Sequence, residues 1–503
     1  MNRRTICLMA AAVAIPIGIG GQPFDMLRAA PSFVEGQQAP PQNPTTAQGT
    51  VLKNKAPVNH EVLKVRLPRP QDADLPNGLH LMVLEDHRAP IVNFQLLIDG
   101  AGGYYDPAEG AGLAGFTAAL MREGTTTKKS EEISRALDRL AASLNFSASI
   151  SSPFATVVGS SLSDQVDPVL AMMADVVEHP SFSDEEIARY KTRTRAQLAQ
   201  QRSQPSFLAA ERFNQIVFGT HPAAHVSATP AALDVLTRDA LVAFHRAHYV
   251  PDHAVMAISG DITLAQAKQK VEAALADWKK ADATIPAVVD PAPISGPSIT
   301  LVARPNSVQT SLVVGTQSIQ RNDPDYAALT VANRILGGPE ARLFEHLREQ
   351  KGYTYGASSN FNSGRFRGSW NAATDVRTEV TEPALTDLLA ELKAMRDVPV
   401  PATELENHKR AIVASFARSL ESPTTVLNSY IDVYIYKLPA DYWDTYPDQV
   451  EKVTAADVQR VAQKYWAPDR LQVVAVGDAA KVEPALAKLG AVKKFDAEGK
   501  EIK

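Results

Sequence analysis

The sequence predicts an α+β fold built from two similar halves. Stretches with strand-like alternation and stretches with helical periodicity follow one another from about residue 58 to residue 490. The stretch 279–298 holds four prolines and has no periodic pattern, as expected of a linker. Landmarks before this linker recur after it at a constant spacing, which indicates an internal duplication.

The constant spacing is 217 residues. The landmarks that share it are Thr237 and Thr454, Tyr249 and Trp466, Pro251-Asp252 and Pro468-Asp469, and Gly260-Asp261 and Gly477-Asp478. Chance similarity is the competing interpretation, because a helix followed by proline, a strand and glycine is a common α/β layout. The duplication predicts a first half at 58–278, a linker at 279–298, a second half at 299–490 and a tail at 491–503.

Composition and the N-terminus predict an exported protein. The chain has 503 residues, a formal net charge of −5 and no long run of like charge, which argues against a nucleic-acid-binding surface. Residues 1–21 begin with basic residues and continue as a short apolar run, as in a secretory signal peptide. Cys7, the single cysteine, lies in this signal, so the mature chain needs no disulfide, and a bacterial periplasm is the predicted location.

The N-terminal region carries one alternative and one further expectation. A signal retained as a membrane anchor is the alternative to cleavage, and apart from the signal no membrane span is predicted. Residues 22–57 are rich in proline and glutamine without periodicity, and they are predicted to form a flexible segment.

Turn and capping residues mark the elements of the first half. The turn at 76–78 precedes a strand at 79–84, and Ala89-Pro90 precedes a strand at 91–98. Ser130 is expected to cap a helix whose first turn is acidic. The other predicted elements are strands at 144–150, 155–162 and 254–259 and helices at 165–178, 184–202, 205–217, 237–249 and 264–278.

The second half shows the same layout. Strands are predicted near 299–304 and 310–316, followed by a helix at 324–336. The run Gly337-Gly338-Pro339 ends that helix, and a further helix is expected at 340–350 until Gly352 stops it. A strand is predicted at 353–358.

The stretch 111–125, AGLAGFTAALMREGT, is predicted to hold the helix around which the site is organised. One apolar stripe at helical spacing is formed by Leu113, Phe116 and Leu120. Another face is formed by Gly115, Ala118 and Ala119, because residues three and four apart are neighbours on a helix. This second face carries no donor, acceptor or charge.

The frame of this helix, G-L-A-x-F-x-x-x-L-M-x-x-G-T, resembles the metal-binding helix of the pitrilysin-type (M16) zinc peptidases. In that family the second face reads His-x-x-Glu-His, in which the imidazoles hold zinc and the Glu activates the bound water. A Glu on a later helix completes the zinc site, but 187–210 has no acidic residue here. The resemblance therefore implies degenerate zinc positions at Gly115, Ala118 and Ala119, with no metal held by this chain.

The resemblance covers about residues 60–490 and implies a fold as well. Members of the family have two homologous halves, each of two α/β sheet-plus-helix domains, which form a clamshell around a peptide chamber. This expectation agrees with the duplication read from the landmarks.

A second motif, ILGGPEARLFEHLREQKGYTYGASSNF, occupies 335–361. It resembles the family block L-G-G-x-x-x-R-L-F-x-x-L-R-x-x-x-G-x-x-Y, whose Arg and Tyr reach the zinc site across the chamber. They match Arg348 and Tyr355, whose guanidinium and phenol would hold the scissile carbonyl and its developing oxyanion. The alternatives are that Arg348 is a solvated helix residue beside Glu349 and that Tyr355 is an ordinary strand aromatic.

Two further features of this motif leave alternatives open. Tyr353 is expected to share the strand face of Tyr355, because side chains two apart point the same way, and it is a candidate to replace Tyr355. Gly337 and Gly338 are candidates for a substrate-binding glycine loop, and a helix C-cap is the competing interpretation.

The remaining histidines give no metal signature. His221 and His225 lie in a loop around Pro222, and the helical pair His245 and His248 has no Glu in a base position. No phosphate-cradling glycine motif appears, so nucleotide use is not indicated.

The resemblance implies that this chain is the non-zinc subunit of a heterodimeric M16-type zinc metallopeptidase that degrades peptides. A zinc-bearing homologue would supply zinc and the Glu base, and this chain would supply Arg348 and Tyr355. Alone, the chain is expected to be inactive. Its substrates would be peptides bound extended along a sheet edge. The alternative is a catalytically inactive peptide-binding or structural protein with the same fold.

Overall fold

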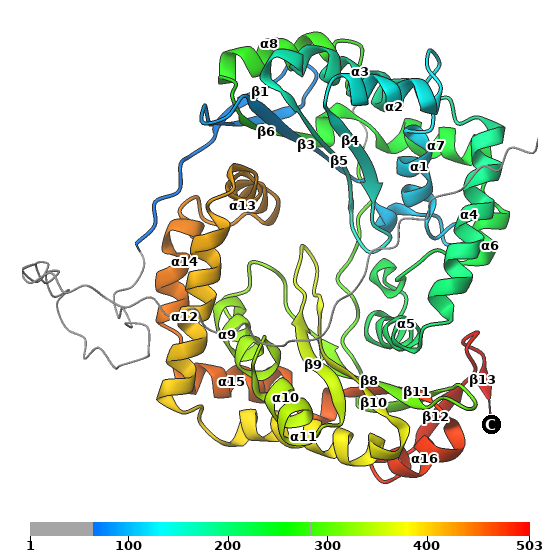
Figure 1. Ribbon diagram of the computed structural model, residues 1–503, viewed down its shortest axis with the longest axis vertical. Coiled ribbons are helices and arrows are strands. Elements are labelled where there is room, and N and C mark those ends of the chain that lie inside the picture. Colours follow the sequence, from blue (N-terminus) through cyan, green and yellow to red (C-terminus); the bar gives the residue numbers. More distant parts are fainter. Residues whose placement is uncertain (1–63, 282–283, 503) are drawn as a thin grey trace, which may run out of the picture. The chain divides into compact units, whose positions relative to one another are not determined.

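The computed structural model describes residues 64–281 and 284–502 (Figure 1). The predicted signal peptide and Pro/Gln-rich segment lie outside these residues. The fold is mixed α/β, with two sheets and many helices. Among the helices of the described ranges, none combines the length and the apolar character needed to cross a bilayer.

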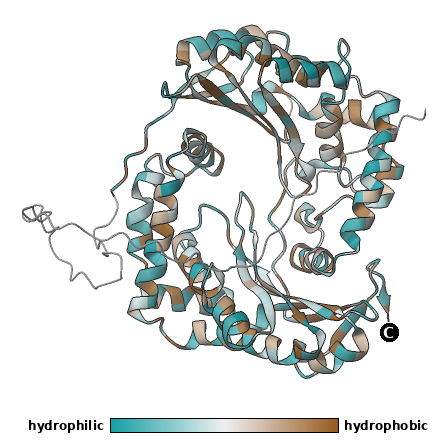
Figure 2. Cartoon of the chain, viewed as in Figure 1, coloured by the Kyte–Doolittle hydropathy of each residue, from teal (hydrophilic) through white to brown (hydrophobic). Residues whose placement is uncertain are grey.

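The first sheet has six strands in the order β1-β2-β6-β3-β5-β4. β2 and β6 are parallel and the other neighbours are antiparallel. The strands are β1 (Gln71–Asp74), β2 (His80–Glu85), β3 (Ile91–Asp99), β4 (Ser143–Ala148), β5 (Phe154–Leu162) and β6 (Ala254–Gly260). Figure 2 shows β3 and β6 mainly in hydrophobic colours, as expected of strands covered on both faces.

The second sheet has seven strands in the order β13-β12-β7-β11-β8-β10-β9. The strands are β7 (Ser298–Ala303), β8 (Gln309–Gln317), β9 (Thr354–Phe361), β10 (Ser369–Arg377), β11 (Gln472–Gly477), β12 (Val492–Phe495) and β13 (Glu501–Ile502). Its run β7-β11-β8-β10-β9 repeats the pairing of β2-β6-β3-β5-β4, with one parallel pair followed by antiparallel pairs. The two halves therefore share one topology.

The helices of the first half pack against both sheets. They are α1 (Leu113–Met121), α2 (Ser130–Arg139), α3 (Val166–Glu178), α4 (Asp184–Arg202), α5 (Pro205–Phe218), α6 (Pro230–Asp234), α7 (Arg238–His248) and α8 (Leu264–Ala274). Helices such as α3 and α8 pack on the first sheet, whereas α5 packs on β8 and β11 of the second sheet. In β2, Leu81 and Val83 join the core formed with α3 and α8, whereas Met82 and Leu84 join the core of the second half. This alternation follows from the two-residue period of a strand.

The helices of the second half include a π-helical segment. They are α9 (Tyr326–Gly337), α10 (Arg342–Phe344), the π-helix Glu345–Gln350, α11 (Thr381–Asp397), α12 (Ala402–Ser419), α13 (Pro423–Tyr436), α14 (Tyr442–Glu451), α15 (Ala455–Tyr465) and α16 (Ala479–Ala487). The landmark residues keep matching roles, since Thr237 caps α7 and Thr454 caps α15 through their side-chain oxygens.

Several predicted elements differ from the structure, among them the strand predicted at 353–358, which as β9 runs to Phe361. The N-cap of α2 is Lys129, whose N–H donates to the Glu132 carboxylate at 2.8 Å, while Ser130 donates to Glu123 at 2.7 Å. The N-cap residue is therefore Lys129, one residue before the predicted cap Ser130. The Glu132 side chain, which belongs to the first turn of the helix, accepts the N–H of this N-cap residue. The helix predicted at 264–278 ends at Ala274. The single helix predicted at 340–350 is instead the short α10 followed by the π-helix.

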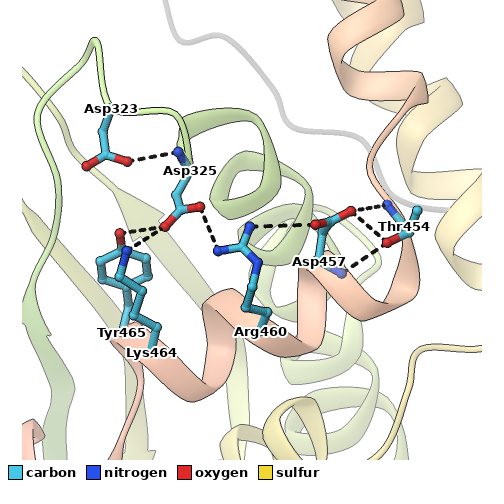
Figure 3. A network of polar contacts seen from close by, with 7 residues as sticks. All are labelled: Asp323, Asp325, Thr454, Asp457, Arg460, Lys464 and Tyr465. Carbon is cyan, nitrogen blue, oxygen red and sulfur yellow. Dashed lines mark hydrogen bonds and ion pairs between the residues drawn. The ribbon is translucent and has the colours of Figure 1, made fainter.

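A buried carboxylate joins α9 to α15 (Figure 3). Asp325 accepts hydrogen bonds from Arg460 at 2.7 Å and from Lys464 and the Tyr465 hydroxyl at 2.8 Å. Burial alone would raise the pKa of Asp325, but the hydrogen bonds from these three donors overcome it and lower that pKa to about 2. The ionised form of Asp325 therefore stabilises the folded state.

We expect Asp325→Asn to reduce the free energy of unfolding by about 2 kcal/mol at pH 7. Because the folded pKa lies below the ordinary value of 3.8, this contribution is complete above about pH 4 and is lost as the pH falls towards 2. Urea unfolding of wild type and variant at pH 7 and pH 3 measures it. Asp448→Asn, at an exposed position of α14, is the control, and an equal loss in both variants would contradict the role of Asp325.

Candidate functional site

The helix α1 is held in place by a carboxylate that sequence reasoning missed. Asp106 accepts the backbone N–H groups of Gly112 at 2.6 Å and Ala114 at 2.7 Å, at the N-terminus of α1. Gly112 has a φ of +112°, in the region that favours glycine. Burial raises the pKa of Asp106 to about 6, and the two backbone hydrogen bonds oppose that rise. Asp106 lies six residues before Gly112, so no local capping pattern would have identified it.

The predicted zinc face of α1 offers nothing that binds a metal. Ala118 is 1% exposed, and Gly115 and Ala119 are half-buried. A Cβ placed on Gly115 would lie 3.1 Å from the Ala148 carbonyl oxygen at the end of β4, so this face packs beside that strand. In 64–281 and 284–502, no three His, Cys, Asp or Glu side chains gather in a way that would hold a metal ion. These residues therefore do not fit the zinc that the family implies.

Helix α4, which follows α1 in the first half, places an aromatic residue against α1. Tyr190 of α4 packs edge-on against Phe116, with ring centroids 5.7 Å apart. Arg193 lies 5.4 Å above the Tyr190 ring, and its guanidinium is 3.7 Å from the Glu123 carboxylate. The part of α4 in which the resemblance places the third zinc ligand thus carries Tyr190 and Arg193, which make aromatic and cationic contacts.

Arg348 lies on the π-helix Glu345–Gln350, a type of segment often found at functional sites. Leu347 is buried beneath it, and His346 Nδ1 lies 2.8 Å from the Glu391 carboxylate on α11. The Arg348 guanidinium stacks 4.7 Å above the Phe344 ring, and its Nε is 3.4 Å from the Glu349 carboxylate. The Arg348 side chain is 44% exposed, so the guanidinium remains accessible.

Tyr355 is the most exposed of the large aromatic residues in the described chain, at 90%. A β-bulge explains this exposure. Ala357 pairs with Thr374 and Thr354 pairs with Val376, so β9 has one residue more than β10 between these two pairs. The Thr354 hydroxyl donates to the Asp375 carbonyl at 2.7 Å and thereby fixes the bulge.

The bulge overturns one expectation. Tyr353 packs against the core of the second half, whereas Tyr355 points into solvent, so the two do not share a face. The predicted two-residue period fails here because the extra residue shifts the alternation. Arg348 and Tyr355 make no hydrogen bond to each other in the described structure, and their catalytic roles stay a prediction.

Gly337 and Gly338 are closely packed. A Cβ on Gly337 would lie 2.1 Å from the Ser359 backbone nitrogen of β9, and one on Gly338 would lie 2.7 Å from the Arg334 carbonyl. The Gly338 N–H donates to that carbonyl at 3.2 Å and ends α9. Packing thus accounts for both glycines, and a contact with substrate stays a prediction.

Three of the histidines considered as possible metal ligands make structural contacts instead. His221 is buried, and its Nδ1 accepts the Ala223 N–H at 3.1 Å. His245 Nε2 lies 2.7 Å from the Val177 carbonyl, and burial lowers the pKa of His245. His248 stacks on Phe244 at 4.2 Å.

A bidentate ion pair fixes the loop that follows β9. The Arg365 guanidinium donates to both oxygens of Asp99, at 3.0 and 2.6 Å, and lies 5.0 Å above the Phe154 ring. Asp99 ends β3 of the first sheet, so the hairpin β9–β10, which carries Tyr355, is anchored to the first half. No sequence pattern indicates this pair.

Comparisons with known proteins place both halves in one family. The family model described as "Insulinase (Peptidase family M16)" matches residues 81–230, and that described as "Peptidase M16 inactive domain" matches residues 236–412. "Uncharacterized zinc protease YmxG" of Bacillus subtilis is 24% identical over 338 residues, covering 65% of this chain and 79% of that protein. "Non-peptidase homolog YmxG" of Helicobacter pylori is 23% identical over 379 residues, covering 74% and 86%.

Solved structures show the same fold. The peptidase M16 inactive domain from Pseudomonas fluorescens has a TM-score of 0.75 and 28% identity, covering 81% of this chain and 98% of that one. A protease from Helicobacter pylori has a TM-score of 0.76 and 18% identity, covering 82% and 100%. With family models matching both halves and this shared fold, the chain belongs to the M16 peptidase family.

Proposed function

We propose that the protein is the non-zinc subunit of a heterodimeric M16-type zinc metallopeptidase that degrades peptides. A zinc-bearing homologue supplies the metal and the Glu base. This chain supplies Arg348 and Tyr355, which together bind the scissile carbonyl and stabilise the oxyanion that develops on it. The pair works in the periplasm, to which the predicted signal at residues 1–21 directs the chain.

The observation that carries the proposal is the α1 face made of Gly115, Ala118 and Ala119, in a chain that retains the Arg348–Tyr355 block. A zinc peptidase needs a ligand set and a base, and neither is present on α1. The exposed phenol of Tyr355 and the accessible guanidinium of Arg348 are groups that a second chain can reach.

The edge of the first sheet supports peptides as the substrates. β4 is the last strand in the sheet order, and α1 packs beside it. An edge strand offers unpaired N–H and C=O groups to which an extended peptide can add as a further strand. Binding through the main chain fits a substrate class of varied sequence.

The second candidate is a peptide-binding or structural protein that has kept the fold without proteolysis. The name "Non-peptidase homolog" of the Helicobacter pylori relative favours it. Both candidates share the missing zinc ligands, and they differ in whether Arg348 and Tyr355 act on a partner's substrate.

Peptide cleavage by the purified chain, by a zinc-bearing M16 homologue from the same genome and by their mixture separates the two. We expect cleavage by the mixture to exceed the sum of the separate rates, together with a stable complex in analytical ultracentrifugation. A mixture that neither associates nor gains activity would favour the second candidate.

The chain alone is expected to bind no zinc at a stoichiometric level. Structural zinc sites obtain about 10–16 kcal/mol from a full ligand set, and the small side chains on α1 supply none of it. Metal analysis of the purified chain after dialysis against zinc measures this, with the zinc-bearing homologue as positive control. One tightly held zinc ion per chain would contradict the assignment.

A further inference from the structure

The second sheet has one face that is only half covered. α5 packs on β8 and β11 of this face (Figure 1), and Gly315 of β8 allows the approach, since its Cβ would lie 2.7 Å from the Phe213 ring. β10 and β9 continue the sheet beyond α5 to its edge. Residues on the uncovered part therefore face a hollow between α5 and the sheet edge.

This hollow is a cavity of about 600 Å³. Four carboxamides line it: Asn214 of α5, Asn360 of β9, Asn371 of β10, and Asn362 just after β9. Asn371 and Asn360 are direct cross-strand partners, so two of the carboxamides lie side by side. We call these four residues the carboxamide cluster.

The carboxamide cluster has its hydrogen-bonding capacity unused. Within residues 64–281 and 284–502, none of the four carboxamide groups makes a hydrogen bond to another protein group. The Ser206 and Ser358 hydroxyls on the same cavity wall are likewise without a protein partner in the described chain. By contrast, Asn333 on the opposite face of this sheet accepts from Ser359 at 2.6 Å and from Trp370 at 2.9 Å.

The cavity is almost free of charge. Its single charged lining residue among the described residues is Asp375, whose carboxylate already accepts from the Ser311 hydroxyl. In the described chain no lysine or arginine lines it, so an anionic ligand would have no counter-charge. Phe213 is 2% exposed, so the cavity wall presents no open aromatic face on which a sugar ring would stack.

A peptide main chain matches this wall. Each carboxamide offers donors and an acceptor, as each peptide group does, and it carries no charge that would select a side chain. β9 is the edge strand beside the carboxamide cluster, and its outer N–H and C=O groups pair with no other strand in the described structure. An extended segment can therefore meet main-chain partners at the strand and carboxamides on the sheet.

We propose that the carboxamide cluster binds the main chain of an extended, uncharged peptide segment. The inference rests on the proposed function, which gives the reason why peptides reach this chain. It adds a binding surface on the second half and a substrate class of extended, uncharged peptide segments. Asn360 and Asn371 are the central contacts. They are binding residues, separate from Arg348 and Tyr355.

The test uses the full chain without a zinc partner and a fluorescein-labelled decapeptide of Ser, Thr, Gln and Val, with binding followed by fluorescence anisotropy. The double variant Asn360→Ala, Asn371→Ala is expected to weaken binding about tenfold, since each hydrogen bond contributes roughly a factor of three to ten. Asn428→Ala, at an exposed position of α13 away from the cavity, is the matched control and is expected to leave affinity unchanged.

Two further probes distinguish recognition of the main chain from recognition of peptide side chains or of a sugar. The same peptide N-methylated at alternate residues, which lacks half its N–H donors, is expected to bind at least about tenfold more weakly to wild type. Chito-oligosaccharide is expected not to compete. Unchanged affinity in the double variant, equal binding of the methylated peptide, or competition by the oligosaccharide would each overturn the inference.

A negative result in this experiment can be distinguished from a failure of the proposed function. If the mixture cleaves peptides through Arg348 and Tyr355 while the double variant binds normally, only the carboxamide cluster is misassigned. If the isolated chain binds the peptide through Asn360 and Asn371 but the mixture shows no cleavage, the proposed subunit role is wrong and peptide binding stands.

Discussion

Replacing Arg348 by alanine is expected to lower peptide cleavage by the mixed subunits about 10²–10³-fold, because one oxyanion-hole donor commonly contributes that much to the rate. Tyr355→Phe removes a hydroxyl and keeps the ring, so a comparable loss would assign the effect to the phenol proton. The rate constant kcat of the mixture, measured at saturating peptide, is the decisive quantity.

Controls of matched chemistry guard against effects on folding. Tyr434→Phe alters an exposed phenol on α13, and Arg418→Ala alters an exposed guanidinium on α12. Both are expected to leave kcat unchanged. If the Arg348 and Tyr355 variants behave like these controls, while complex formation persists, the two residues have no part in the reaction.

Gly337→Ala is expected to destabilise the chain by about 3 kcal/mol or more, at the upper end of the usual cost of overpacking. Its Cβ would lie 2.1 Å from the Ser359 backbone nitrogen and 2.3 Å from the Ser359 hydroxyl oxygen, so β9 must move away from α9. Since β9 carries Tyr355, the same change is also expected to lower activity of the mixture. Urea unfolding and the cleavage assay measure the two effects.

Gly364→Ala is the matched control, because a Cβ there meets nothing within 4 Å and the backbone does not require a positive φ. Its stability is expected to equal that of wild type. If Gly337→Ala is as stable as wild type, the contact between α9 and Ser359 of β9 does not require glycine at position 337.

The sequence predicted most elements of the first half because their signals are local. Strands such as 91–98 and helices such as 184–202 depend on periodicity and caps within a few residues, and the structure places them within a residue or two of those bounds. The duplication was readable for the same reason, since Thr237 and Thr454 fulfil the same local role at the start of α7 and α15. The loss of zinc ligands at Gly115, Ala118 and Ala119 is a matter of residue identity alone.

Sequence patterns did not predict the features that depend on contacts between two segments distant along the chain. The face of Tyr355 depends on a bulge set by the register between β9 and β10, which no single-strand period reveals. Two members of the carboxamide cluster show a period-two signal, since Ser358 and Asn360 on β9 and Asn362 just after it alternate along the chain, but α5 is needed to turn that face into a cavity.

By itself, the sequence determined the family resemblance, the duplicated α+β layout and the absence of metal ligands on α1, because side-chain chemistry and short-range periodicity decide these. The tertiary structure alone decided which groups are accessible and which are anchored: Tyr355 exposed by a bulge, Asp106 capping α1, and Arg365 joined to Asp99. Such contacts join residues distant along the chain, and their geometry exists only once the strands and helices have packed.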